Sequence, residues 1–126
     1  MIKFIFLCLW YLLPAALGNH TASCGNRIWL PAILKNGLAK LSRPVDFGVQ
    51  WHGREIFGKN KTWRGLLVGI AVGVLAAGIQ ALLFFKNDFF RANTLVDYTK
   101  VNFILLGGLM GGGALIGDLV KSFIKR

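Results

Sequence analysis

The last ten residues of the chain are the ones best suited to chemistry. The segment 117–126 reads GDLVKSFIKR and follows a glycine-rich apolar run without a charged residue. At 3.6 residues per helical turn, one acid, one hydroxyl and two cations of this segment fall on one helix face, namely Asp118, Lys121, Ser122 and Lys125. A carboxylate suits a divalent cation, and ammonium groups suit phosphates. Lysines alone would be explained by snorkelling into lipid headgroups, but an acid near the hydrocarbon boundary is costly and usually functional.

A second polar segment, KNKTWRG at 59–65, lies directly before another apolar run. The amino terminus of a helix has unpaired N–H groups and partial positive charge, so cations and a hydroxyl at this place favour phosphate binding. The spacing GxxxxGK[ST] of a nucleotide-binding P-loop does not occur. The alternative is a polybasic segment that binds anionic lipid, at about 1 kcal/mol per cation. The candidate phosphate-binding residues are Lys59, Lys61, Thr62 and Arg64.

Membrane helices are the elements that must position these residues. The chain has 126 residues, 55% of them hydrophobic, whereas soluble domains have about 45–50%. Residues 66–85 carry no charge and one polar side chain, Gln80, and twenty helical residues span about 30 Å, the thickness of the hydrocarbon. Residues 101–119 and 2–17 are two further apolar runs, the latter with an expected bend at Pro14. We therefore expect an all-α, polytopic membrane protein with about three transmembrane helices in a single domain, 1–126.

The amino-terminal run has a second interpretation. A lysine, a leucine-rich core and the small residues at 15–18 also resemble a secretory signal peptide. No clear A-x-A cleavage site follows, and Trp10, Tyr11 and Pro14 fit such a peptide poorly. Sequencing the mature amino terminus would decide, because a start near Asn19 would exclude a retained helix.

Charge placement predicts which segments share a side of the membrane. The formal net charge is +10, and the loop 18–65 carries eight cations against two acids, Asp46 and Glu55. The loop 86–100 is nearly balanced. The positive-inside rule therefore places the basic loop and the end of the chain in the cytoplasm, where the two polar segments could form one site.

The glycines of the apolar runs predict close helix packing. Gly65, Gly69 and Gly73 recur every fourth residue, and six more glycines crowd 107–117. Small residues at this spacing allow transmembrane backbones to approach one another. Cys8 and Cys24 have neither metal-site nor predictable disulfide spacing. Nucleic-acid binding is disfavoured, because no soluble domain with interleaved aromatic residues remains outside the apolar runs.

Three ordered motifs resemble the CDP-archaeol synthase family, which is related to the CDP-diacylglycerol synthases. They are RPVDFG with HGREIFG at 43–58, KTWRG at 61–65, and GALIGDLVKSFIKR at 113–126. The resemblance implies a multi-helix enzyme of the inner membrane that uses CTP and Mg²⁺. Such an enzyme transfers CMP to a lipid phosphate and releases pyrophosphate. In archaea the implied acceptor is a digeranylgeranylglyceryl phosphate, and in bacterial relatives it is less defined.

The resemblance also implies roles for the candidate residues. Asp118 would bind magnesium and Ser122 would orient a phosphate, while Lys121, Lys125 and Arg126 would contact the lipid phosphate or pyrophosphate. Lys59, Lys61, Thr62 and Arg64 would hold the triphosphate, and Asp46 would be a second metal ligand or would recognise the base. Members of the family continue beyond the KSFIKR segment, so a truncated form of a larger bundle is expected.

Two other classes of function remain open. A non-catalytic adaptor would bind anionic lipid through residues 35–64, with an affinity that falls with salt and does not depend on CTP. A homo-oligomer packed through its glycine-rich helices would form a pore and leak ions. Transfer of CMP from labelled CTP would distinguish the enzyme from both.

Overall fold

The computed structural model describes residues 1–24, 36–37, 39–45, 47, 49–55 and 61–125. Three long helices dominate it: α1 (Ile2–Cys24), α3 (Trp63–Lys86) and α5 (Phe103–Ile124). Each is long and apolar enough to cross a membrane, which confirms the predicted all-α membrane fold with three spans. The smaller elements are the turn η1 (Ala39–Leu41), the helix α4 (Asp88–Ala92) and an antiparallel hairpin of β1 (Gln50–Trp51) and β2 (Arg54–Glu55).

The predicted boundary between the first span and the basic loop is wrong. The polar residues from Asn19 onward suggested that a loop begins at residue 18, but α1 continues to Cys24. Gly18 and Ala22 lie against α3, and this packing supports the extra turns. The apolar patch at 28–34 lies outside the described residues.

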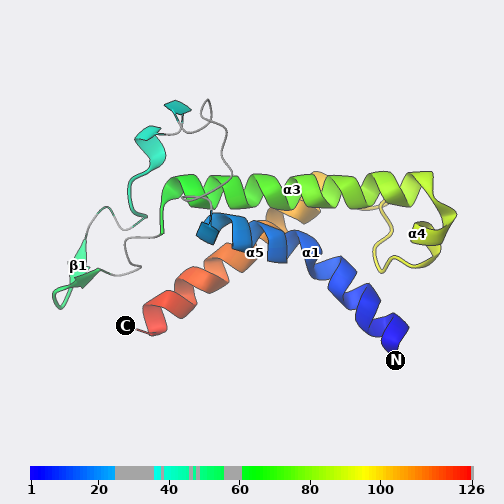
Figure 1. Cartoon of the computed structure of the whole chain (residues 1–126), viewed down its shortest axis with the longest axis horizontal. Helices are drawn as coiled ribbons and strands as arrows, with labels where there is room; N and C mark the ends of the chain where they lie inside the picture. Colours follow the sequence, from blue (N-terminus) through cyan, green and yellow to red (C-terminus); the bar gives the residue numbers. More distant parts are fainter. Residues whose placement is uncertain (25–35, 38, 46, 48, 56–60, 126) are drawn as a thin grey trace.

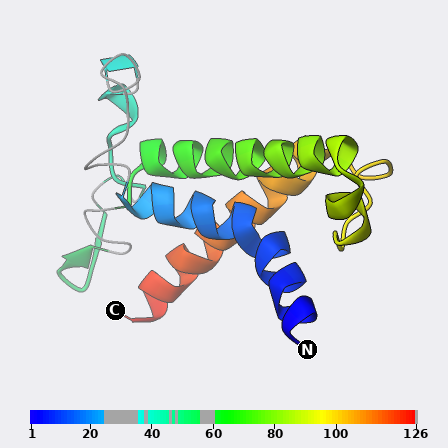
Figure 2. The ribbon, with the colours of Figure 1, turned by 45° about the vertical axis from the view of Figure 1, so that its right-hand side comes forward.

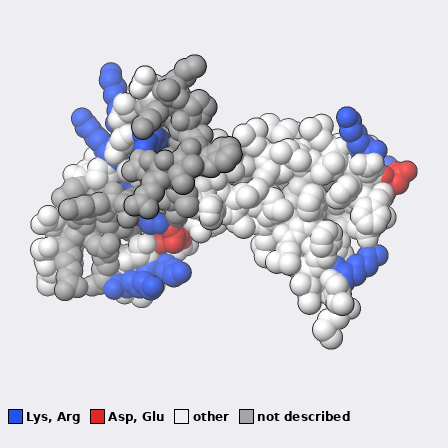
Figure 3. Space-filling view, viewed as in Figure 1, with Lys and Arg blue, Asp and Glu red and all other residues white. Residues whose placement is uncertain are grey.

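The two polar segments lie at the same end of the helix bundle, as predicted. The end of α1, the beginning of α3 and the end of α5 gather at one end, while the amino terminus and α4 lie at the other (Figures 1 and 2). In the space-filling view, charged side chains occupy both ends and the middle is uncharged (Figure 3). This distribution is the one that a bilayer requires, because charges in the hydrocarbon are costly.

Glycine holds the three helices at close range, as the four-residue spacing predicted. A Cβ atom at Gly69 would lie 2.7 Å from the carbonyl oxygen of Gly18 in α1. A Cβ atom at Gly107 of α5 would lie 2.6 Å from the Cα atom of Val74 and 2.7 Å from the carbonyl oxygen of Gly73. Such contacts leave no room for a side chain, so α3 packs against both neighbours through its backbone.

Other glycines of α5 do not take part in this packing. A Cβ atom at Gly113 or Gly117 would meet nothing within 4 Å, and at Gly108 or Gly112 it would make only ordinary contacts of 3.9 Å and 4.0 Å. The glycine content of 107–117 therefore has a packing explanation on one face of α5 only.

A buried amide compensates for the proline in α1. Pro14 has no N–H group, so the carbonyl of Trp10, four residues earlier, loses its helical donor. The Nε2 atom of Gln80 in α3 donates to this carbonyl at 2.5 Å, and the Oε1 atom of Gln80 accepts from the hydroxyl of Tyr98 at 3.0 Å. Gln80 is only 4% exposed. The one polar side chain of the central span thus stabilises the predicted bend of α1, which is visible in Figure 2.

Tyr98 connects this arrangement to the loop that precedes α5. Its ring packs on Phe84 and Ala81 of α3 in a small core at the α4 end of the bundle. Burial raises the pKa of the Tyr98 hydroxyl, which keeps the group protonated and able to donate to Gln80.

Candidate functional site

Thr62 begins helix α3 and defines one side of the candidate site. It is the N-cap residue, with extended backbone angles, and its Oγ1 atom accepts from the Gly65 N–H at 3.2 Å. The N–H of Trp63 donates to the carbonyl of Arg43 at 3.3 Å. The Trp63 and Gly65 amides of the first turn therefore have partners within the protein. Phosphate binding at this helix start stays a prediction.

The first sequence motif lies directly beside this helix start. Pro44 forms an antiparallel bridge with Thr62, and the N–H of Val45 donates to the carbonyl of Lys61 at 2.9 Å. Asp46 lies outside the described residues, but Val45 before it lines the site described below. The RPVDFG and KTWRG motifs, 18 residues apart at their first positions, thus belong to one local structure.

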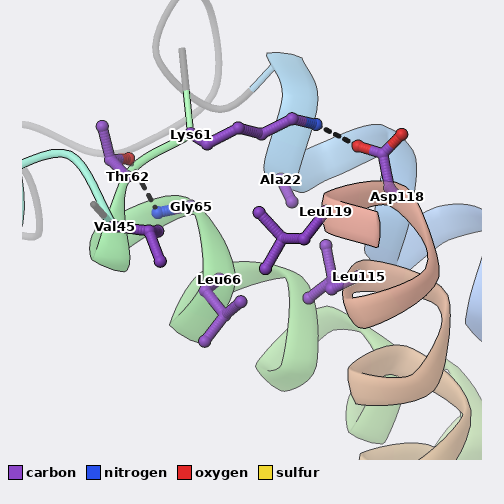
Figure 4. A pocket seen from close by; sticks show the side chains of 9 residues that line it. All are labelled: Ala22, Val45, Lys61, Thr62, Gly65, Leu66, Leu115, Asp118 and Leu119. Carbon is purple, nitrogen blue, oxygen red and sulfur yellow. Dashed lines mark hydrogen bonds and ion pairs between the residues drawn. The ribbon is translucent and has the colours of Figure 1, made fainter. Parts of the chain in front are cut away.

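An ion pair joins the start of α3 to the end of α5. The Nζ atom of Lys61 donates to the Oδ2 atom of Asp118, across 57 residues of sequence (Figure 4). The side chains are 24% and 23% exposed, so the pair is partly withdrawn from water. The sequence predicts that the two polar segments could form one site, and this contact brings one residue of each segment together.

The pair covers a small recess between the three helices. Its free volume is about 20 Å³, enough for roughly one water molecule. A phosphate group therefore does not fit inside the recess while Lys61 and Asp118 are in contact. The recess has an apolar floor, and the Lys61 and Asp118 side chains meet across it (Figure 4). The lining residues are Ala22, Val45, Lys61, Thr62, Gly65, Leu66, Leu115, Asp118 and Leu119.

The other predicted site residues on α5 lie further along the same helix. Lys121 and Lys125 are exposed and Ser122 is half-buried, at the spacing that puts them on the face of Asp118. They do not line the recess. Arg64, predicted to hold the triphosphate, is only 7% exposed. Lys59, Asp46 and Arg126 lie outside the described residues.

A single carboxylate is the metal-binding chemistry that the described residues offer at this site. Among them, no group of three or more His, Cys, Asp and Glu residues could hold a metal ion. Magnesium in nucleotide enzymes is typically bound by one or two carboxylates together with phosphate oxygens and water. Asp118 therefore fits a Mg²⁺ ion that arrives with a triphosphate.

Sequence reasoning missed several residues of the recess. Ala22 was assigned to a loop, and Leu115 and Leu119 were read only as part of an apolar span. Leu115 lies three residues before Asp118, and this spacing is the signal that could have found it. Leu119 directly follows Asp118 and has no such signal. Asn19 was also missed: its Oδ1 atom is buried and has no hydrogen-bond partner in the part of the chain that the structure describes.

Comparison with known proteins identifies the family. The family model described as CarS-like, CDP-archaeol synthase, matches residues 1–126. The chain belongs to the CDP-archaeol synthase family. A CDP-archaeol synthase from Pyrococcus furiosus is 40% identical over 123 residues, covering 97% of this chain and 59% of the relative. Another from Methanocaldococcus jannaschii is 36% identical over 126 residues, covering 98% and 62%. The chain thus spans about 60% of the length of these curated relatives.

A third member, from Methanosphaerula palustris, is 43% identical over 101 residues, which cover 77% of this chain and 57% of the relative. No solved structure matches this chain significantly. The family and the three membrane-spanning helices together make it a multi-pass membrane protein.

Proposed function

We infer that this chain contributes the nucleotide site of a CTP-dependent cytidylyltransferase that acts on a lipid phosphate. The observation that carries the proposal is the contact between Lys61 and Asp118, which joins a phosphate-binding cation to a metal-binding acid at one end of the bundle. Relatives over nearly the whole chain are named CDP-archaeol synthase, which supports this reaction.

The proposed reaction is a displacement at phosphorus. An oxygen of the lipid phosphate attacks the α-phosphorus of CTP, a new P–O bond forms, and the bond from the α-phosphorus to the bridging oxygen of the β-phosphate breaks. Pyrophosphate leaves, and CMP remains on the lipid as a CDP-lipid. Two anions must meet in this reaction, so the protein has to neutralise their charge and hold them in line.

The residues divide between these tasks. Lys61 would bind the triphosphate, and Asp118 would hold Mg²⁺ together with phosphate oxygens. Mg²⁺ supplies charge neutralisation on the phosphates when it is bound. Lys121 and Lys125 are exposed on the last turns of α5 and would meet the lipid phosphate. Ser122 on the same face would orient it.

The sidedness follows from the same proposal. CTP is a cytoplasmic nucleotide, and the positive-inside rule also assigns the basic end of the bundle to the cytoplasm. The proposed location is therefore the cytoplasmic membrane, with the Lys61–Asp118 end inside and α4 outside.

The alternative functions lose part of their support. The glycines that would form an oligomeric pore pack within one chain at positions 65, 69, 73 and 107. A homo-oligomer would have to use the uncovered glycines of α5, and cross-linking at that face tests it. A lipid-binding adaptor has no need of a carboxylate paired to Lys61.

The test follows where the α-phosphate and the γ-phosphate of CTP are found after the reaction. Membranes from cells that express the gene are given CTP labelled at the α-phosphate or at the γ-phosphate, with a lipid phosphate acceptor. We expect the α-label in the lipid fraction and the γ-label in pyrophosphate. Absence of α-label from the lipid would refute cytidylyl transfer, and γ-label in the lipid would indicate a kinase instead.

Two variants connect the test to the site. Asp118→Asn should abolish transfer while the protein stays folded in the membrane, and Lys61→Ala should raise the CTP concentration needed for half-maximal rate. Lys86→Ala is the matched control, because Lys86 is an exposed cation at the opposite end of α3. If Lys61→Ala and Lys86→Ala leave the same CTP dependence, Lys61 is not a triphosphate ligand.

A further inference from the structure

We propose that the Lys61–Asp118 contact is a closed resting state of the site, in which each side chain blocks the ligand of the other. A nucleoside triphosphate requires the Lys61 ammonium, and a divalent cation requires the Asp118 carboxylate. Only the two ligands together replace both halves of the ion pair. This inference rests on the proposed function and adds that the two ligands bind cooperatively.

The burial of the pair supplies the coupling. With side-chain exposures of 24% and 23% in the closed pair, both charges are partly withdrawn from water. A cation alone would take the carboxylate and leave Lys61 unpaired, and metal-free triphosphate would take Lys61 and leave Asp118 unpaired beside an anion. Removing one partner of a withdrawn ion pair is costly because the remaining charge is uncompensated. Binding of both ligands avoids this cost at both positions.

Entry of a phosphate chain between Lys61 and Asp118 requires the pair to open. The recess beneath the pair has a free volume of about 20 Å³, which is too small for a phosphate group. The backbone at Lys61 and Thr62 is held by hydrogen bonds, since the Lys61 carbonyl accepts from Val45 and the Thr62 carbonyl accepts from Leu66 at 3.1 Å. The lysine side chain, a flexible four-carbon stem, is therefore the part that moves when the site opens.

The opposing interpretation is a passive ion pair that merely docks the loop onto α5. The two interpretations differ in what the removal of one partner does to the affinity for the other partner's ligand. In a closed resting state, Asp118→Asn releases Lys61 and strengthens the binding of metal-free CTP. Loss of a negative charge near an anion would also strengthen binding, so the single variant is not sufficient.

A double-mutant cycle separates these effects. Binding of CTP in the presence of EDTA is measured by titration calorimetry on the purified chain in detergent, for the unchanged protein, Asp118→Asn, Lys61→Gln and the double variant. We expect Asp118→Asn to strengthen CTP binding about tenfold when Lys61 is present, which corresponds to about 1.4 kcal/mol. In the Lys61→Gln background the same change should have little effect. Equal strengthening in both backgrounds would mean simple repulsion and would overturn the proposal.

Chemical reactivity of the lysine gives a second measurement that needs no nucleotide. Reductive methylation followed by mass spectrometry reports how accessible each amine is. Lys61 should react slowly in the unchanged protein and at least severalfold faster in Asp118→Asn, whereas Lys86 should react equally in both. A Lys61 rate that does not respond to Asp118→Asn would show that the pair does not form, and the inference would fail.

The reciprocal measurement uses magnesium alone. Lys61→Gln should bind Mg²⁺ about tenfold more tightly than the unchanged protein, because the carboxylate no longer has a competing partner. Unchanged Mg²⁺ affinity contradicts the resting state. These results are distinguishable from a failure of the proposed function: coupled binding without CMP transfer would refute the enzyme and keep the resting state, and transfer without coupling would do the reverse.

Discussion

Replacing Gln80 by leucine should destabilise the bundle through an unpaired carbonyl in α1. Gln80 makes two hydrogen bonds, 2.5 Å to the Trp10 carbonyl and 3.0 Å to the Tyr98 hydroxyl. Leucine has a similar volume and removes both. The Trp10 carbonyl then has no donor, because Pro14 has no N–H to offer. An unsatisfied buried polar group costs about 1–3 kcal/mol, so with two such groups we expect a loss of about 2–6 kcal/mol.

A second substitution, Pro14→Ala, tests whether the cost of Gln80→Leu comes from the Trp10 carbonyl. Pro14→Ala restores an N–H group four residues after Trp10, so the helix can satisfy the carbonyl itself. Pro14→Ala alone should lose stability, because Pro14 is less than 2% exposed and its ring packs in the bundle. In the Pro14→Ala background, however, Gln80→Leu should cost about 1–2 kcal/mol less than in the unchanged protein, the share that belongs to the carbonyl.

The assay is reversible unfolding of the four proteins in mixed micelles with increasing denaturing detergent, followed by far-ultraviolet circular dichroism. The quantity compared is the free-energy cost of Gln80→Leu with proline and with alanine at position 14. If Gln80→Leu costs the same with proline or alanine at position 14, then Gln80 does not compensate for the proline, and the hydrogen bond to Trp10 contributes nothing to stability.

Three further predictions follow from the packing and the caps. Gly107→Ala should destabilise the bundle by about 1–3 kcal/mol in the same unfolding assay, because its Cβ atom would lie 2.6 Å from the α3 backbone. Gly113→Ala on the same helix has open space and should be neutral or stabilising. Asn102→Ala removes the side-chain cap of α5 and should cost about 1 kcal/mol, whereas Asn87→Ala, where the side chain makes no cap bond to α4, should cost less. The pKa of Tyr98 is raised in the folded protein, so the contribution of its hydroxyl to the free energy of unfolding is full below pH 10 and is lost as the pH rises further. The unfolding midpoint should therefore fall above pH 10, and Tyr98→Phe should reduce this fall.

The spans were predictable from the sequence because they depend on composition. A long apolar run with few or no charges can be read directly, and all three helices formed where such runs occur. The end of α1 was not predictable in this way. Asn19 and the polar residues after it resemble a loop, and the helix continues because Gly18 and Ala22 pack on a helix that begins some forty residues later.

The site was predictable in its location and not in its contacts. Charge placement put the segments around Lys61 and Asp118 on the same side of the membrane. This inference requires only that the chain crosses the membrane an even number of times between the two segments. Their contact depends on how α3 and α5 pack, which a single sequence does not reveal. The occupied amides at the start of α3 illustrate the same limit. Thr62 was recognisable as an N-cap, but the carbonyl of Arg43 arrives through tertiary structure.

The packing of the helices and the chemistry of the site depend on one another in this fold. Gly69 lies against Leu115 of α5, with 2.9 Å between a Cβ atom at position 69 and the Leu115 Cδ1 atom, and Leu115 lines the recess one turn before Asp118. A Cβ atom at Gly69 would also lie 2.7 Å from the carbonyl oxygen of Gly18, so a side chain there would push α1 away from α3 and force the Leu115 side chain to move. Gly107 lies 11 residues before Asp118, about 16 Å along the helix, so a change there acts on stability with less effect on the ion pair. The glycines nearest the site therefore do more than permit close packing, because they set how closely α1 and the Leu115 side chain approach α3 beside the recess.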